Sequence, residues 1–366
     1  MRYKLFGHSG LRVSELCLGT MTFGEEWGYG ASKETCRQIF DTFLQAGGNF
    51  LDTANLYTNG ASERYLGEFV QAEREHLVLS TKYTMAVPGH DPNAAGTQRK
   101  NLVQSLEASL KRLLTDYIDV YFIHIWDFLT PIEEVMQALS DVVRAGKVLY
   151  VGISNTPAWI ISRANTLAEF RGWTAFTGMQ VEYNLTQRTA ERELLPMARS
   201  LDLAVTVWSP LASGILTGKY NQGQGSGRAG LAQPHERSLA IAAQVVKIAQ
   251  ARGCSPSQVA LSWVRQQPGV IIPILGARTV AQLEENLQCV QVTLTQEEMS
   301  QLDALSQIDL GYPHTYLQPT DPHNLAYGGL FDQIDAHRGI EALPQPVKVR
   351  EATSEMERAA YVEKAR

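Results

Sequence analysis

The chain alternates between short apolar stretches, typical of buried strands, and longer amphipathic stretches, typical of helices. The strand-like stretches begin near Leu16, Phe50, Leu77, Val120, Val148, Met179, Ala204 and Val270. Between them lie helix-like stretches such as residues 100 to 114, with leucines at helical spacing, and residues 131 to 145, which a proline opens. Eight strand and helix pairs favour a closed (β/α)8 TIM barrel over an open doubly wound sheet, although the pattern is compatible with both.

Three segments depart from this repeat. Residues 4 to 13 are typical of a small N-terminal β-hairpin. The interval after the seventh strand, from Trp208 to Val270, is long, and its Gly-rich polar middle (221 to 230) indicates an inserted loop of the kind that often forms a lid. We expect a barrel domain over residues 1 to 310. Residues 311 to 366 should form a C-terminal extension, partly extended or helical, that either lines the substrate pocket or stays exposed.

The composition favours a small-molecule ligand. The net charge is −6, from 32 Lys and Arg against 38 Asp and Glu, and no dense basic run suggests a nucleic-acid or membrane partner. The first residues lack the apolar core of a signal peptide and no stretch could span a bilayer, so we expect a cytoplasmic protein. The four cysteines are widely spread and the eight histidines lack ligand spacing, which predicts reduced thiols and no metal site. Oligomerisation stays open.

Four polar residues lie at or just after strand-like runs: Asp52, Tyr57, Lys82 and His124. In a barrel, the residues after each strand gather at one rim, where such folds hold their active sites. A phenol with a pKa near 10 is a poor acid at neutral pH unless a cation such as Lys82 stabilises its phenolate. Asp52 would keep Lys82 protonated, and an uncharged His124 could orient a carbonyl group. We therefore expect Tyr57 to act as a general acid.

With these residues in view, the chain resembles the aldo-keto reductase superfamily over roughly residues 1 to 310. Within it, the chain is most similar to the branch that includes aryl-alcohol-dehydrogenase-like enzymes and potassium-channel β subunits. The matching motifs are Gly19-Thr-Met21, Asn49-Phe-Leu-Asp-Thr-Ala-Asn-Leu-Tyr57, Asp116-Tyr-Ile-Asp-Val-Tyr-Phe-Ile-His124, Gly152-Ile-Ser-Asn155, Trp208-Ser-Pro-Leu211 and Gly276-Ala-Arg278 to Glu285-Asn286. The resemblance implies NAD(P)H-dependent reduction of aldehydes or ketones, with hydride reaching carbon while Tyr57 protonates oxygen.

The resemblance also implies a cofactor site. Its nicotinamide carboxamide would be bound by Ser154, Asn155 and Gln180, its ring stacked by Trp208, and its pyrophosphate contacted by Ser209, Leu211, Gly214 and Lys219. Gln282, Glu285 and Asn286 would face the adenosine, and Gly19, Thr20, Met21, Asp52, Pro210, Ser213 and Gly276 complete the expected cofactor-binding set. Arg278 matches the residue that meets a 2′-phosphate. Because a guanidinium suits a phosphate, NADPH is expected in preference to NADH.

Tyr83 and Trp126 follow Lys82 and His124, and we expect both near the pocket mouth as contacts for a small carbonyl substrate. Core packing is the alternative for Trp126. Two other functions stay open: an NADP(H)-binding regulatory subunit resembling channel β subunits, with little turnover, and a barrel enzyme of other chemistry.

Two further patterns imitate known motifs. Tyr29 and Lys33 have the spacing of the short-chain dehydrogenase pair, but they precede a helix for which Ser32 is the expected cap. Gly223, Gly225 and Gly227 copy a dinucleotide fingerprint, but no strand leads into them. We expect neither pattern to bind a cofactor.

Overall fold

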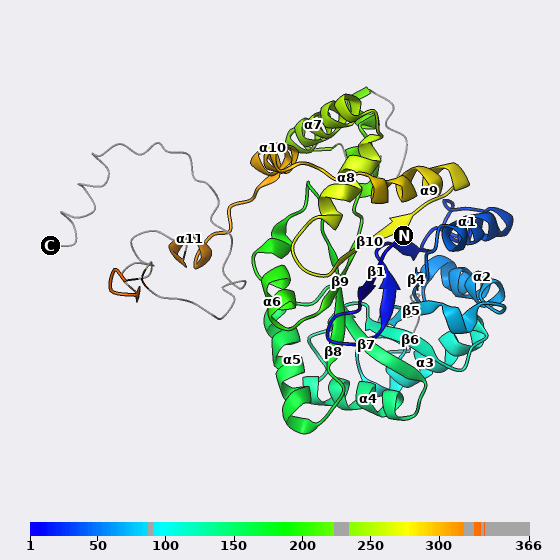
Figure 1. The fold of residues 1–366 in the computed structure, drawn as a ribbon. Helices are drawn as coiled ribbons and strands as arrows, with labels where there is room; N and C mark the ends of the chain where they lie inside the picture. Colours follow the sequence, from blue (N-terminus) through cyan, green and yellow to red (C-terminus); the bar gives the residue numbers. More distant parts are fainter. Residues whose placement is uncertain (87–90, 223–233, 318–325, 331–332, 334–366) are drawn as a thin grey trace. The chain divides into compact units, whose positions relative to one another are not determined.

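The computed structural model describes residues 1–86, 91–222, 234–317, 326–330 and 333 of the chain (Figure 1). It divides into two compact units, Met1–Asp309 and Leu310–Arg366. The second unit contains the short helix α11 (His314–Leu317). All of the elements described below belong to the first unit.

Eight parallel strands close into a barrel in the order β10-β3-β4-β5-β6-β7-β8-β9 (Figure 1). They are β3 (Cys17–Gly19), β4 (Phe50–Asp52), β5 (Val78–Tyr83), β6 (Ile118–Ile123), β7 (Val148–Ser154), β8 (Phe176–Glu182), β9 (Ala204–Trp208) and β10 (Ile271–Gly276). The pairing of β10 with β3 closes the sheet and confirms the predicted (β/α)8 barrel. The predicted start was least accurate for β8, which begins at Phe176 and not at Met179.

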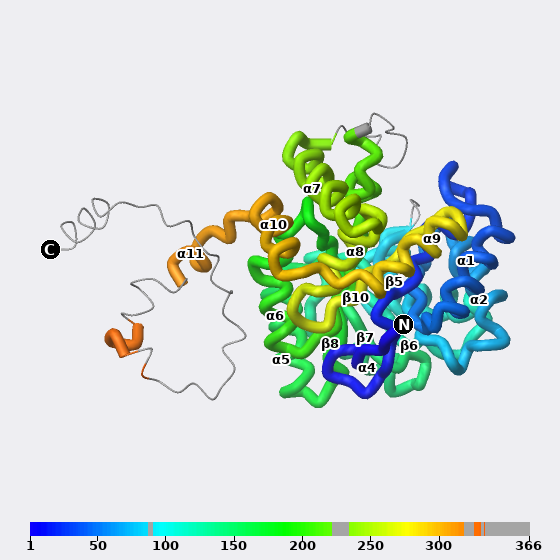
Figure 2. Tube along the Cα trace, turned by 45° about the horizontal axis from the view of Figure 1, so that its top comes forward, coloured from blue at the N-terminus to red at the C-terminus, as the bar shows by residue number. Residues whose placement is uncertain are grey.

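Helices surround the strands (Figures 1 and 2). They are α1 (Lys33–Gln45), α2 (Ala61–Phe69), α3 (Arg99–Leu113), α4 (Ile132–Arg144), α5 (Ala158–Arg171), α6 (Leu194–Ser200), α7 (Glu236–Arg252), α8 (Pro256–Arg265), α9 (Val280–Leu287) and α10 (Gln296–Ser306). Their starts follow local chemistry. Ser32 caps α1 as predicted, accepting a hydrogen bond from the Thr35 N–H, and α10 opens with a capping box formed by Thr295 and Glu298.

The side chains of the strands alternate between two apolar regions, apart from a register shift where β7 pairs with β8. One side chain of each neighbouring pair lies in a cluster inside the barrel, which includes Cys17, Phe50, Val78, Val120, Phe122, Ala204, Ile272 and Ile274. The next lies in the larger cluster between the barrel and its helices, which includes Leu18, Leu51, Leu79, Tyr121, Ile123, Val205 and Leu275. Successive strand residues point to opposite faces, so the position of a residue within its strand decides whether it reaches the interior.

The amino-terminal end of the barrel is covered by an antiparallel hairpin of β1 (Tyr3–Leu5) and β2 (Arg12–Ser14), which confirms the predicted hairpin. Phe6 is fully buried and meets Phe50 edge-to-face, with ring centroids 5.7 Å apart. A Cβ at Gly178 would lie 2.5 Å from the Phe6 ring, so only glycine fits there. Since Phe6 belongs to the interior cluster, it fills the barrel at this end.

The interval between β9 and β10 contains the 3-10 helix η4 (Ala212–Thr217), followed by η5 (Lys219–Gln222), α7 and α8. Most of the predicted inserted loop, and the glycines at 223, 225 and 227, lie outside the described residues. In the described parts of the chain, no helix is both long and apolar enough to span a membrane.

Candidate active site

The structure brings Asp52, Tyr57, Lys82 and His124 together at the carboxyl end of the barrel. The Lys82 Nζ donates hydrogen bonds to Asp52 Oδ2 at 2.6 Å and to the Thr53 carbonyl oxygen at 2.7 Å, and lies 3.4 Å from Tyr57 Oη. The rings of Tyr57 and His124 meet edge-on, with centroids 5.9 Å apart. A phenol therefore lies between a buried ammonium and an imidazole.

The charges of this group are set by burial and by its own members. Burial alone lowers the pKa of Lys82, but the charges and hydrogen bonds of Asp52 and Tyr57 outweigh it, so the pKa of Lys82 is raised and the ammonium persists. For His124, burial and then the charge of Lys82 lower the pKa to about 3. At neutral pH the imidazole is uncharged and carries a single ring N–H.

The carboxylate of Asp52 is fixed by three donors. Ser80 Oγ and Gln180 Nε2 donate to Oδ1 at 2.8 and 3.0 Å, while Lys82 occupies Oδ2. Gln180, which we expected at the nicotinamide carboxamide, therefore also orients the ion pair. Ser80 escaped the sequence analysis, although its place two residues before Lys82 puts it on the same strand face.

Tyr57 opens the 3-10 helix η1 (Tyr57–Gly60), and the next residues anchor it. Thr58 is buried, and its hydroxyl donates to the Phe23 carbonyl oxygen at 2.6 Å and accepts from the Ser62 N–H at 3.1 Å. Thr58 and Asn59 both have left-handed backbone, with φ of 46° and 53°. Such a conformation in a β-branched residue is costly, and it fixes the turn that presents the phenol.

Tyr83 does not lie at the pocket mouth, which corrects our expectation. It follows Lys82 directly, and because Lys82 points into the barrel, Tyr83 points outward. Its ring is fully buried, stacks on Tyr121 at 5.2 Å, and donates from its hydroxyl to the Thr97 carbonyl oxygen. Tyr83 is thus a core residue. Trp126 is half-buried and packs against the outer core, and its contact with substrate stays a prediction.

The residues expected around a nicotinamide surround the same rim. Ser154 Oγ donates to the Gln180 carbonyl oxygen at 2.9 Å, and Asn155, at φ 47°, donates from its amide to the His124 carbonyl oxygen. Trp208 Nε1 and His124 Nδ1 are buried without a hydrogen-bond partner among the described residues. Unsatisfied buried polar atoms are rare, so each of these two atoms could pair with a polar ligand group.

The stretch expected at the pyrophosphate has an unusual backbone. Ser209, Ala212, Ser213 and Gly214 all have positive φ, between 50° and 90°. A Cβ at Gly214 would lie 3.2 Å from Lys219 Nζ, so the glycine lets the ammonium approach the chain. Left-handed turns of this kind gather backbone N–H groups into anion-binding concavities. The other members of the stretch, Pro210 and Leu211, connect it to β9.

The remaining expected cofactor residues lie on β3 and the loop after it, and from the end of β10 into helix α9. Arg278 is exposed next to Thr279, which caps α9 by accepting from the Gln282 N–H, while Gln282 Oε1 accepts from the Arg278 N–H. Glu285 and the buried Asn286 follow on that helix. Gly19 leaves room for Ile274, and Gly276 is exposed. The Thr20 hydroxyl donates to the Asp52 carbonyl oxygen, and Met21 is half-buried. These placements are compatible with a dinucleotide.

Two residues at the rim escaped the sequence analysis. Trp27, in the loop between β3 and α1, meets Tyr57 edge-on with centroids 6.3 Å apart, and its indole N–H donates to Asn59 Oδ1 at 3.4 Å. Glu182 ends β8 and pairs with Trp208 across the strands. The signal for Glu182 was its spacing of two residues from Gln180. Trp27 could have been found only as an aromatic residue in a loop that follows a strand.

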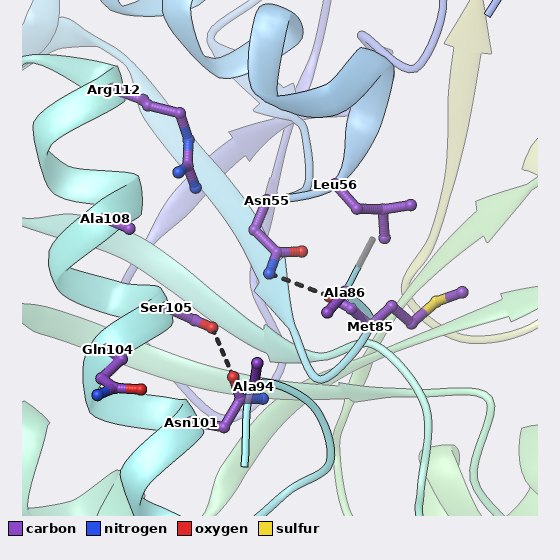
Figure 3. Close-up of a pocket in the computed structure, with 10 residues that line it drawn as sticks. All are labelled: Asn55, Leu56, Met85, Ala86, Ala94, Asn101, Gln104, Ser105, Ala108 and Arg112. Carbon is purple, nitrogen blue, oxygen red and sulfur yellow. Dashed lines mark hydrogen bonds between the residues drawn. The ribbon is translucent and has the colours of Figure 1, made fainter. Parts of the chain in front are cut away.

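A separate pocket of about 250 Å³ lies between the loop before Tyr57 and helix α3 (Figure 3). Its lining is mostly polar on the helix side, and Arg112 closes one end with its guanidinium bonded to Glu63. Asn55 donates to the Met85 carbonyl oxygen, and its own side-chain oxygen has no partner among the described residues. The pocket borders the segment that carries Tyr57, but none of the four central residues lines it.

Comparison with known proteins agrees with this geometry. The family model described as the Aldo/keto reductase family matches residues 15–307. The chain is 37% identical to norsolorinic acid reductase stcV of Emericella nidulans, over 96% of this chain and 94% of that protein. It is 35% identical to aryl-alcohol dehydrogenase GME11368 of Pestalotiopsis microspora, over 93% of each. It is 36% identical to aldo-keto reductase ausK of Aspergillus calidoustus, over 86% of this chain and 84% of that protein. The chain therefore belongs to the aldo/keto reductase family and is an oxidoreductase.

Proposed function

We propose that the protein reduces aldehydes or ketones to alcohols with NADPH, and that Tyr57 is the general acid. The observation that carries this proposal is the buried chain from Asp52 through Lys82 to Tyr57 beside an uncharged His124. An ammonium held 3.4 Å from a phenol oxygen favours the phenolate that remains after proton donation.

Each residue has a separate part in the proposed reaction. The bound nicotinamide cofactor supplies the hydride that reaches the carbonyl carbon. Tyr57 Oη gives its proton to the carbonyl oxygen, and Lys82 compensates the negative charge that develops on the phenol. Asp52, fixed by Ser80 and Gln180, keeps Lys82 charged and in place. His124, as a neutral N–H donor, orients the carbonyl oxygen toward Tyr57.

The residues present fit a phosphorylated dinucleotide. Lys219 and the left-handed turns from Ser209 to Gly214 would hold the pyrophosphate, and the unpartnered N–H of Trp208 marks the nicotinamide end. The exposed Arg278 at the start of α9 would meet a 2′-phosphate, because a guanidinium and a helix N-terminus both attract one. This arrangement supports NADPH in preference to NADH.

We further propose aromatic carbonyl compounds as the substrates. Trp27 and Tyr29, with ring centroids 6.1 Å apart, extend from Tyr57 along the loop after β3, and Phe128 is 67% exposed in the loop after His124. Such rings bind flat aromatic molecules by stacking and edge-to-face contacts. Relatives named norsolorinic acid reductase and aryl-alcohol dehydrogenase support the same class.

The test compares the wild type with Tyr57→Phe. We expect the turnover of an aromatic aldehyde to fall by about 100-fold or more, since a positioned acid is worth at least that, while the Kd for NADPH stays unchanged. The control is Tyr117→Phe. It removes a phenol hydroxyl just before β6, at the end of that strand away from His124. The wild type should also prefer benzaldehyde to an aliphatic aldehyde of similar size. Undiminished turnover in Tyr57→Phe would refute the assigned acid.

A further inference from the structure

Glu182 is the last residue of β8 and points into the barrel. On this strand a Cβ at Gly178 would meet Phe6 of the interior cluster, and Gln180 bonds Asp52, so from Gly178 onward the even-numbered residues face inward. Met179 and Val181 lie in the outer cluster. The alternation of side chains from Gly178 onward, and the pairing of Glu182 with Trp208, which packs against the interior cluster, place Glu182 inside, one inward position closer to the rim than Gln180.

The carboxylate of Glu182 carries an uncompensated charge. It is half-buried, and within the described ranges it has no hydrogen bond and no ion pair. Burial raises its pKa, and no neighbouring cation opposes that effect. The charges of Lys82 and Asp52 balance each other, because the two side chains form an ion pair. His124 is neutral. Among Asp52, Lys82, His124 and Glu182, the net charge is thus negative and located at Glu182.

The neighbours of Glu182 define what this charge acts on. Its cross-strand partner is Trp208, and the register pairs Gln180 with Thr206 one step below. Trp208 and Gln180 are the residues proposed to stack on the nicotinamide ring and to bind its carboxamide. A charge beside these two residues, in a half-buried position where protein replaces part of the water, interacts with a bound ring more strongly than it would in solution.

We infer that the Glu182 carboxylate stabilises the oxidised, positively charged nicotinamide ring in this site relative to the neutral reduced ring. This rests on the proposed function, because it requires Gln180 and Trp208 to hold the ring. A nicotinamide ring is neutral before it loses a hydride and carries one positive charge afterwards. A fixed negative charge beside it therefore lowers the energy of the state toward which hydride donation proceeds.

The experiment measures the dissociation constants of NADPH and NADP+ for the full-length protein by fluorescence titration at pH 7.5. In Glu182→Gln, the ratio of Kd for NADP+ to Kd for NADPH should rise on the order of tenfold, as expected for removal of a unit charge at a distance of a few side chains. Glu182→Asp keeps the charge and should keep the wild-type ratio. Glu169→Gln, an exposed residue on α5, is the control for net charge.

The outcomes separate the two proposals. A Glu182→Gln protein that binds both nucleotides with the wild-type ratio, or binds both more weakly by the same factor, overturns the role of Glu182 and leaves the proposed function intact. A wild type that binds neither nucleotide overturns the proposed function and the inference with it. If Glu182→Gln does not fold, Glu182→Ser removes the same charge and must show the same rise in the ratio.

Discussion

The ionisation of His124 is determined by its surroundings. Burial and the nearby Lys82 ammonium lower its pKa to about 3, far below the ordinary value near 6.5. A protonated imidazole next to Lys82 would repel it, and the neutral ring instead offers one N–H to a carbonyl oxygen. The side chain whose ordinary pKa lies closest to neutral pH is here a neutral donor.

This shift makes the stability of the protein depend on pH. Below pH 6.5 the unfolded chain binds a proton at position 124 and the folded chain does not, so the free energy of unfolding falls as the pH falls toward 3. Between pH 6.5 and pH 5, the wild type should lose about 1.5 kcal/mol more than His124→Gln. Urea denaturation at the two pH values measures this difference. Equal losses in the two proteins would show that His124 is protonated in the folded state.

Some residues of the candidate site could be predicted from the sequence and others could not. Asp52, Lys82 and His124 could be predicted because each ends or follows an apolar run, and strand ends meet at one rim of a barrel. The prediction that Tyr83 lies near the pocket mouth is wrong, because adjacent strand residues face opposite sides. Lys82 points into the barrel, and its neighbour Tyr83 lies in the outer cluster. Counting in steps of two from Lys82 and Gln180 would have excluded Tyr83 and found Ser80 and Glu182.

Among the secondary elements, helix α9 combines two features that favour a phosphate: an N-terminus and the exposed Arg278. In Arg278→Ala we expect the Kd for NADPH to rise about tenfold or more, because a charge-assisted hydrogen bond is lost, while the Kd for NADH changes little. Isothermal titration with both cofactors measures this.

The control for this prediction is Arg12→Ala, which removes the same charge from the hairpin at the opposite end of the barrel. It should leave both dissociation constants at their wild-type values. Equal weakening of NADPH and NADH in Arg278→Ala would assign the arginine to the part of the dinucleotide that the two cofactors share.

At the element scale, the strands were easier to predict than the segment that follows β9. Each buried strand is a short apolar run bounded by turn residues, which leaves a clear local signal. The polar, glycine-rich residues from 221 to 230 predict a loop, and most of them lie outside the described residues. The helices α7 and α8 follow in the same interval. The signal for α7 was present, since Ile241, Val245 and Ile248 recur at helical spacing and are buried.

In the whole barrel, the packing at the hairpin end and the proposed binding site lie at opposite ends, so a substitution can change stability without changing cofactor binding. Phe6 fills the interior at the hairpin end, whereas the proposed chemistry lies at the other end. Phe6→Ala should lower the free energy of unfolding by about 3–5 kcal/mol, as expected for a large side chain removed from a packed core. The KM for NADPH should stay unchanged. Chemical denaturation and steady-state kinetics on the same preparation measure the two quantities.

Leu5→Ala in the same hairpin is the matched control. Leu5 is 54% exposed, so its loss should change the free energy of unfolding by no more than about 0.5 kcal/mol. If Phe6→Ala behaved like Leu5→Ala, the hairpin would not contribute to the packing of the barrel interior.

The alternation of strand side chains also bears on how such a protein can diversify. The ion pair proposed to support proton transfer, Asp52 and Lys82, comes from positions inside strands, where inserting one residue would reverse every side chain that follows. The aromatic residues proposed to meet the substrate, such as Trp27 and Phe128, lie in loops, which tolerate insertion and exchange. Descendants of one ancestral barrel can therefore acquire new substrates by changing loops while inheriting the reaction unaltered, and a protein engineer can graft loops between relatives for the same reason.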